Sequence, residues 1–107
     1  MSYSVDRVAW AQRPFLDQMA NIGSEVGRTI AAKQAGNDER ATQALVRALD
    51  LFDATVEQLV RTKSPRLKEV LRAKEQFVAV YTVATGRAAT DSLQYFHDFG
   101  MAARMHR

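Results

Sequence analysis

The pattern that most constrains this chain is a set of apolar columns at helical spacing across its first third. Residues seven apart form three adjoining columns: Val5, Gln12, Met19 and Val26; Val8, Phe15, Ile22 and Thr29; Ala9, Leu16, Gly23 and Ile30. Such columns form one broad buried face of an α-helix. The pattern predicts a helix from about Val5 to Ala35, capped by Ser4 and ended by Gly36. Pro14 interrupts it, and it either kinks the helix near Trp10 or starts a second helix after a short first one. Because the columns keep their register across the proline, we favour one kinked helix.

Three further segments, at about 37–63, 64–86 and 90–105, carry apolar residues at the same spacing. The clearest boundary is Ser64 followed by Pro65, because serine suits a helix N-cap and proline suits the first helical position. The connections between the segments are short, which makes sequential helices antiparallel neighbours. The sequence therefore predicts an all-α fold, an up-and-down four-helix bundle that forms a single domain over residues 1–107.

The chain has 107 residues, of which 47% are apolar and 25% charged, which is typical of one soluble globular domain. It contains no cysteine, so disulfides and thiolate metal ligands are excluded. The first residues, MSYSVDRVAWAQRP, lack the pattern of a signal peptide. No apolar run approaches the roughly 18 residues that a membrane span requires. We therefore expect a soluble, cytoplasmic protein that does not enter a membrane.

Two glycines four residues apart lie in the stretch IGSEVGR (22–28) of the first predicted helix. Each costs about 1 kcal/mol relative to alanine in a helix interior. A glycine-rich phosphate loop requires a preceding strand, whereas the helical period here continues on both sides, so we interpret the glycines as a close helix crossing. The small residues expected to meet at this crossing are Gly23, Gly27 and Ala31 on the first helix and Gly100 and Ala103 on the last.

Basic residues are concentrated between positions 61 and 74, where six of them accompany one acidic residue. The candidates for anion binding are Arg61, Lys63, Arg66, Lys68 and Arg72. They surround the turn before the third helix, whose first N–H groups add donors, and they could hold an anion or follow a nucleic-acid backbone. However, the segment has no helix-turn-helix pattern and no aromatic residues between the charges. The alternative is that it only makes one end of the bundle soluble.

The last predicted helix, YFHDFGMAARM, carries three aromatic residues and two methionines within eleven residues. One helix cannot turn all of them into a four-helix core, so some should lie in a groove or a subunit interface. We also expect the start of the long first helix to extend beyond the bundle and to expose Trp10. The candidate interface residues are Trp10, Tyr95, Phe99, Met101 and Met105. These features favour a homodimer, with another protein as a further partner.

Two groups of charged residues are candidates for chemical sites. Glu25 and Arg28 are expected to form an ion pair at the surface, although Arg28 could instead bind an anion. Asp50, Asp53 and Glu57 share one side of the second helix, which is more typical of a solvated face than of a metal site. No histidine lies three residues after a glutamate, as a di-iron bundle would require. We therefore assign no catalytic residue, no cofactor and no metal.

The stretch EVGRTIAAKQAGNDER (25–40) is loosely similar to part of the small all-helical chorismate mutases, which grip an anionic substrate with arginines. The residues that carry the similarity are Arg28, Lys33, Asp38, Glu39 and Arg40. It covers under a fifth of the chain, and the last helix lacks the glutamine usual in that family. The similarity would imply a small helical enzyme acting on an anionic substrate.

The general layout resembles a group of small all-helical bacterial proteins of unknown function. The residues behind this resemblance are Trp10, IGSEVGR, RALDLFDAT (47–55) and YFHDFGMAAR. It implies a bacterial, cytoplasmic origin and transfers no catalytic residue. Taken together, the sequence predicts a non-enzymatic interaction or assembly module, with nucleic-acid or anion binding through residues 61–74 as the first alternative.

Overall fold

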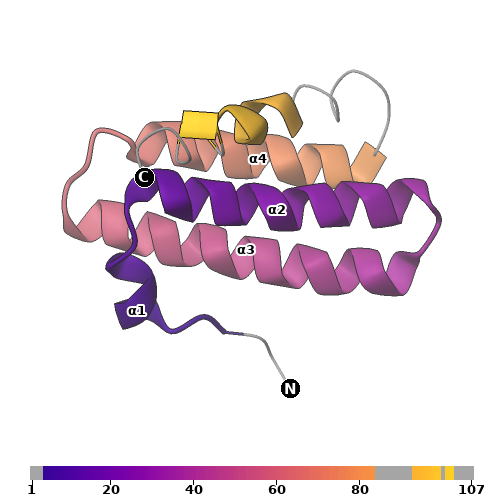
Figure 1. Cartoon of the computed structure of the whole chain (residues 1–107), viewed down its shortest axis with the longest axis horizontal. Coiled ribbons are helices and arrows are strands. Elements are labelled where there is room, and N and C mark those ends of the chain that lie inside the picture. Colours follow the sequence, from indigo (N-terminus) through magenta and orange to yellow (C-terminus); the bar gives the residue numbers. More distant parts are fainter. Residues whose placement is uncertain (1–3, 84–92, 100, 103–107) are drawn as a thin grey trace.

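The computed structural model describes residues 4–83, 93–99, 101 and 102, and every regular element among them is helical. A short helix, α1 (Arg7–Ala11), precedes three long ones, α2 (Phe15–Gln34), α3 (Asp38–Arg61) and α4 (Leu67–Val83). A C-terminal helix follows at residues 93–99. Figure 1 shows α2, α3 and α4 side by side, with the C-terminal helix (gold) above them and α1 below one end. The all-α prediction is confirmed for this part of the chain.

The first predicted helix is in fact two helices, because Pro14 breaks it. Asp6, and not Ser4, caps α1, since its Oδ1 accepts from the N–H groups of Val8 and Ala9 at 3.0 and 3.2 Å. Pro14 is the N-cap of α2, with an extended ψ of 147°. Proline lacks an N–H and pushes the residue before it out of the helical region, so α1 cannot continue through it. The favoured prediction of one kinked helix is therefore wrong, and the alternative of a short first helix followed by a second one is confirmed.

The predicted boundary between the first and second long helices is confirmed. Gly36 has a φ of 75°, and the N–H groups of Gly36 and Asn37 donate to carbonyls of the last turn of α2. Asn37 then caps α3, because its Oδ1 accepts from the N–H of Arg40 at 3.1 Å. Gly36 therefore ends α2, and Asn37 begins α3 directly after it, so the chain reverses its direction within about three residues.

The third long helix begins slightly later than predicted. Ser64 accepts from the N–H of Arg66 through its hydroxyl at 3.2 Å, but residues 65–66 form a turn and α4 starts at Leu67. The predicted end of this helix at Gly86 and the predicted start of the last helix at residues 90–91 lie outside the described residues.

The core lies between α2, α3, α4 and the C-terminal helix. The side chains at its centre are Met19, Ile22, Val26, Phe52, Phe77 and Phe96. The ring of Phe52 on α3 lies 6.0 Å from the ring of Phe77 on α4 and 6.0 Å from that of Phe96. Phe96 thus inserts the C-terminal helix into the same core as the long helices. Among the described helices, none is both long enough and apolar enough to cross a membrane.

Candidate functional site

The stretch IGSEVGR lies directly beneath the C-terminal helix. A Cβ atom added to Gly23 would lie 2.6 Å from Cβ of Phe96, and one added to Gly27 would lie 3.8 Å from Cδ2 of Leu93. Gly23 is therefore the position where only a hydrogen leaves room for the neighbouring helix. Ala31 does not take part, because it is exposed. Gly100 and Ala103, the other residues predicted at this crossing, lie outside the described residues.

Trp10 is buried within the chain, so the prediction that it is exposed for an interface is wrong. Its indole Nε1–H donates to Oγ1 of Thr55 at 2.9 Å, and its backbone carbonyl accepts from Nε2 of Gln18 at 2.8 Å. The break at Pro14 explains this position, since it turns α1 back against α3 instead of letting it extend beyond the bundle. Trp10 is thus an internal contact between the N-terminal segment and α3.

The acidic residues of α3 are used in ion pairs between helices. Arg7 of α1 bonds Asp50 at 2.8 Å and Glu57 at 3.1 Å. The hydrogen bond to Asp50 is the main reason that the pKa of Arg7 is raised. Asp53 pairs with Lys74 of α4 at 2.7 Å. Among the described residues, no three carboxylates or histidines are grouped closely enough to hold a metal ion.

The aromatic residues of the C-terminal helix mostly pack inside the chain. Phe99 meets the ring of Phe15 at 5.8 Å, and the hydroxyl of Tyr95 donates to Glu69 at 2.9 Å. Burial, followed by this hydrogen bond, raises the pKa of Tyr95 above its ordinary value. Met101 is exposed, and Met105 lies outside the described residues. Of the residues predicted for the interface, Met101 alone is exposed in the part of the chain that the structure describes.

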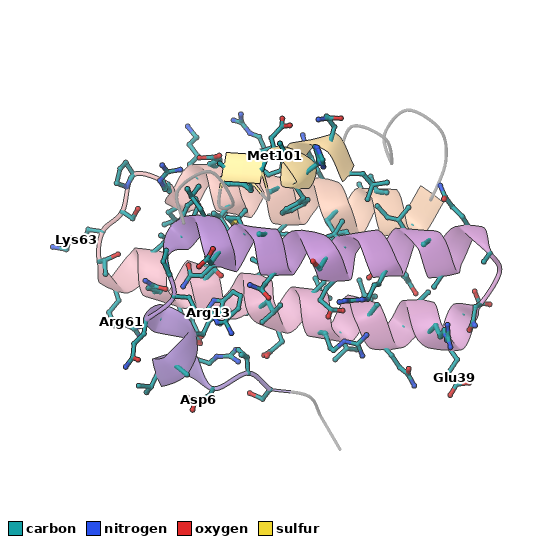
Figure 2. The ribbon with its side chains drawn as sticks, in the orientation of Figure 1. Asp6, Arg13, Glu39, Arg61, Lys63 and Met101 are labelled. Carbon is teal, nitrogen blue, oxygen red and sulfur yellow. The ribbon has the colours of Figure 1, made fainter. Side chains whose placement is uncertain are left out.

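The basic run is divided between several surfaces. Arg66 stacks over the ring of Phe15 at 4.5 Å and lies 3.9 Å from Glu69. Lys68 and Arg72 line a hollow beside the C-terminal helix. Arg61 and Lys63 project from the end of the bundle, as Figure 2 shows. The five candidate anion-binding residues therefore do not converge on one point.

A further surface, which the sequence did not reveal, joins α3 to α4. We call it the α3/α4 face, and it consists of Val46, Asp53 and Val60 on α3 and Leu71, Lys74 and Val78 on α4. The three residues on α3 are seven apart and those on α4 are three and four apart, so each set lies on one side of its helix. The 2.7 Å contact between Asp53 and Lys74 brings the two sides together. All four aliphatic residues of this face are exposed.

No family model matches the chain, and neither a curated protein nor a solved structure is significantly similar to it. The two resemblances drawn from the sequence therefore stay predictions. Any proposal about function has to rest on the residues and surfaces described above.

Proposed function

We propose that this protein is a non-enzymatic interaction module that assembles as a homodimer through the α3/α4 face. In this proposal α2, α3, α4 and the C-terminal helix complete an up-and-down four-helix bundle, and its outer α3/α4 side receives a second copy. The observation that carries the proposal is the group of exposed aliphatic side chains around one central ion pair.

The exposure of these residues is what distinguishes this side of the bundle. Val46, Leu71 and Val78 are 43 to 45% exposed, and Val60 is 57% exposed. A single exposed aliphatic residue is ordinary on a protein surface, but a continuous apolar patch rimmed by polar residues is typical of an interaction site. Leu49, Val56 and Leu67 lie three or four residues along the same helices from Val46, Val60 and Leu71, and they are half-buried against the core.

The charges at the centre of the face favour a second copy as the partner. A twofold dimer brings the same patch of both subunits together, so the patch must complement itself. If the twofold axis runs parallel to the helices, α3 of one copy lies on α4 of the other, and Asp53 meets Lys74 of the second copy. If the axis runs across the helices, like charges meet instead, which is unfavourable. The face therefore complements itself in one of these two arrangements.

Light scattering after size-exclusion chromatography, over a range of protein concentrations, tests the proposal. We expect the wild type to have the mass of a dimer and Leu71→Glu to be monomeric, because the variant places an unpaired carboxylate in the apolar interface. The matched control is Val8→Lys, which changes an aliphatic residue of α1 that is 71% exposed and lies outside the face. A monomeric wild type, or equal weakening by both variants, would refute the proposal.

The charge arrangement has its own test. Asp53→Lys should weaken the dimer, and the double variant Asp53→Lys with Lys74→Asp should restore it, since opposite charges then face each other again. Asp53→Lys also removes the ion pair between Asp53 and Lys74 within each chain. Circular dichroism shows whether the variant is still folded without this pair. Failure of the double variant to dimerise would contradict the proposed orientation.

The first alternative from the sequence, nucleic-acid or anion binding by residues 61–74, predicts a different behaviour. Affinity for nucleic acid would fall steeply with salt and would be lost when Arg66, Lys68 and Arg72 are changed to glutamate. The proposed function requires that this triple variant keep the dimer mass, because none of the three residues belongs to the α3/α4 face. Loss of the dimer in this variant, with folding intact, would count against the proposal.

A further inference from the structure

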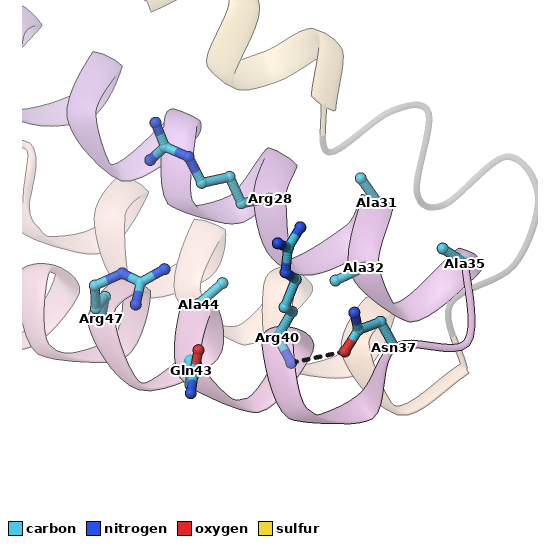
Figure 3. Close-up of a pocket in the computed structure, with 9 residues that line it drawn as sticks. All are labelled: Arg28, Ala31, Ala32, Ala35, Asn37, Arg40, Gln43, Ala44 and Arg47. Atoms are coloured by element: carbon cyan, nitrogen blue, oxygen red, sulfur yellow. Dashed lines mark hydrogen bonds between the residues drawn. The ribbon is translucent and has the colours of Figure 1, made fainter.

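A groove of about 480 Å³ lies between the last turns of α2 and the first half of α3. Figure 3 shows Arg28 of α2 and Arg40 and Arg47 of α3 around it. Much of the remaining lining consists of alanines, including Ala32 and Ala44, whose small side chains leave the space between the two helices open. Three arginine residues thus line one hollow.

A carboxylate next to the groove holds two of these arginines in place. Glu25 accepts from NH1 of Arg28 at 2.8 Å through Oε1 and from Nε of Arg47 at 3.0 Å through Oε2. Its side chain is only 14% exposed, so it is a fixed anchor rather than a mobile surface group. Each guanidinium has five N–H donors, and these contacts leave most of them available.

Arg40 is the third arginine, and its guanidinium contacts no acceptor in the described part of the chain. It lies in the first turn of α3, where the helix dipole disfavours a positive charge. Asp38 and Glu39 share this turn but do not line the groove, so the charged residues that line it, together with the adjacent Glu25, carry three positive charges and one negative charge. This local excess of positive charge suits an anionic ligand.

We propose that this groove binds a phosphate group, either as the free ion or as part of a small phosphate ester. A phosphate ester carries about 1.5 to 2 negative charges at neutral pH, which is close to the excess positive charge of the groove. Guanidinium groups bind phosphate oxygens through paired, charge-assisted hydrogen bonds. The side chains of Asn37 and Gln43 also line the groove and can donate to further oxygens. This inference does not depend on the proposed dimer.

Isothermal titration calorimetry of the full chain with inorganic phosphate tests the proposed phosphate site. A reference titration uses sodium chloride at the same ionic strength in place of phosphate. We expect saturable binding to the wild type and affinity at least about tenfold lower for Arg40→Gln, because one charged hydrogen-bonding group is lost. Arg40 is exposed and unpaired, so this variant should stay folded, which circular dichroism checks. The matched control is Arg13→Gln, an exposed arginine just before α2 and at the opposite end of that helix from the groove, which should bind like the wild type.

Three results would overturn the proposal. The first is phosphate binding no stronger than that of chloride. The second is equal affinity of the Arg40 and Arg13 variants, which would place any binding elsewhere on the protein. The third is succinate binding as tight as that of phosphate, since the groove would then select a doubly charged anion of any kind. A phosphate ester that binds more tightly than the free ion would support the proposal and identify the ester as the better ligand.

Discussion

The change Gly23→Ala tests how closely the C-terminal helix lies on α2. The new Cβ would lie 2.6 Å from Cβ of Phe96 and 3.2 Å from its Cγ, so the C-terminal helix has to shift. Phe96 is held in the core by Phe52, and overpacking of such a site costs about 1–3 kcal/mol. Alanine recovers up to about 1 kcal/mol of helix propensity. The difference is a net loss of roughly 0–2 kcal/mol, so we expect Gly23→Ala to lower the free energy of unfolding by about 1 kcal/mol.

The matched control is Gly27→Ala, one turn further along the same helix. Its new Cβ would lie 3.8 Å from Cδ2 of Leu93, which is an ordinary van der Waals contact. This variant should therefore be more stable than the wild type, by about 0.5–1 kcal/mol, since the propensity gain is not opposed. Urea unfolding followed by circular dichroism measures both changes. If both variants gain or both lose stability to the same extent, Phe96 does not lie as close to Gly23 as the structure indicates.

Three further predictions concern single side chains. Thr55→Val removes the acceptor of the buried Trp10 indole and should cost about 1–3 kcal/mol in urea unfolding, whereas Thr62→Val, at an exposed threonine, should cost little. The raised pKa of Tyr95 favours the protonated phenol in the folded state, so its contribution to stability is complete below about pH 10 and is lost as pH rises through the folded pKa. Unfolding free energy of the wild type should thus fall more steeply above about pH 10 than that of Tyr95→Phe, and parallel curves would contradict this. Lys63→Gly should raise the melting temperature, because Lys63 has a φ of 51° that glycine adopts without strain. An unchanged melting temperature would contradict the idea that Lys63 is strained.

The features that the sequence predicted well are those decided within one or two helical turns. Gly36 and Asn37 end one helix and begin the next through hydrogen bonds to nearby backbone groups. The broad apolar columns likewise determine which side of α2 is buried, whatever lies against it. Such local signals need no knowledge of the rest of the chain.

The break at Pro14 could not be predicted from the local sequence pattern, because it is accompanied by contacts between distant parts of the chain. The apolar register continues across the proline, so it is equally compatible with a kink and with two helices. The contacts that accompany the break are long-range ones, from Trp10 to Thr55 and from Arg7 to Asp50. These partners lie more than 40 residues apart in the chain, and nothing near Pro14 indicates them.

The candidate surfaces were missed for a related reason. The aromatic residues of the C-terminal helix seemed too many for one core, but Phe96 enters the core while Tyr95 and Phe99 pack on α4 and α2. Val46 and Val60 follow the same seven-residue spacing as core positions, so their exposure becomes visible only when the position of α4 is known. The arginine groove combines residues from two helices. The sequence singled out Arg28 with its partner Glu25, and the similarity to chorismate mutases included Arg28 and Arg40, but nothing in the sequence placed Arg47 beside them.

The two proposed surfaces lie on different sides of α3, and this separation has a physical consequence. Val46 and Arg47 are adjacent in the chain, but successive side chains of a helix point about 100° apart. Val46 therefore belongs to the side near α4, whereas Arg47 reaches Glu25 on α2. A ligand in the groove contacts α2 and α3, and both helices keep their positions within either subunit of the proposed dimer. Ligand binding and assembly are coupled only if the ligand has different contacts in the monomer and the dimer. The geometry provides no such difference, so the two surfaces should act independently, and each proposal can fail without the other.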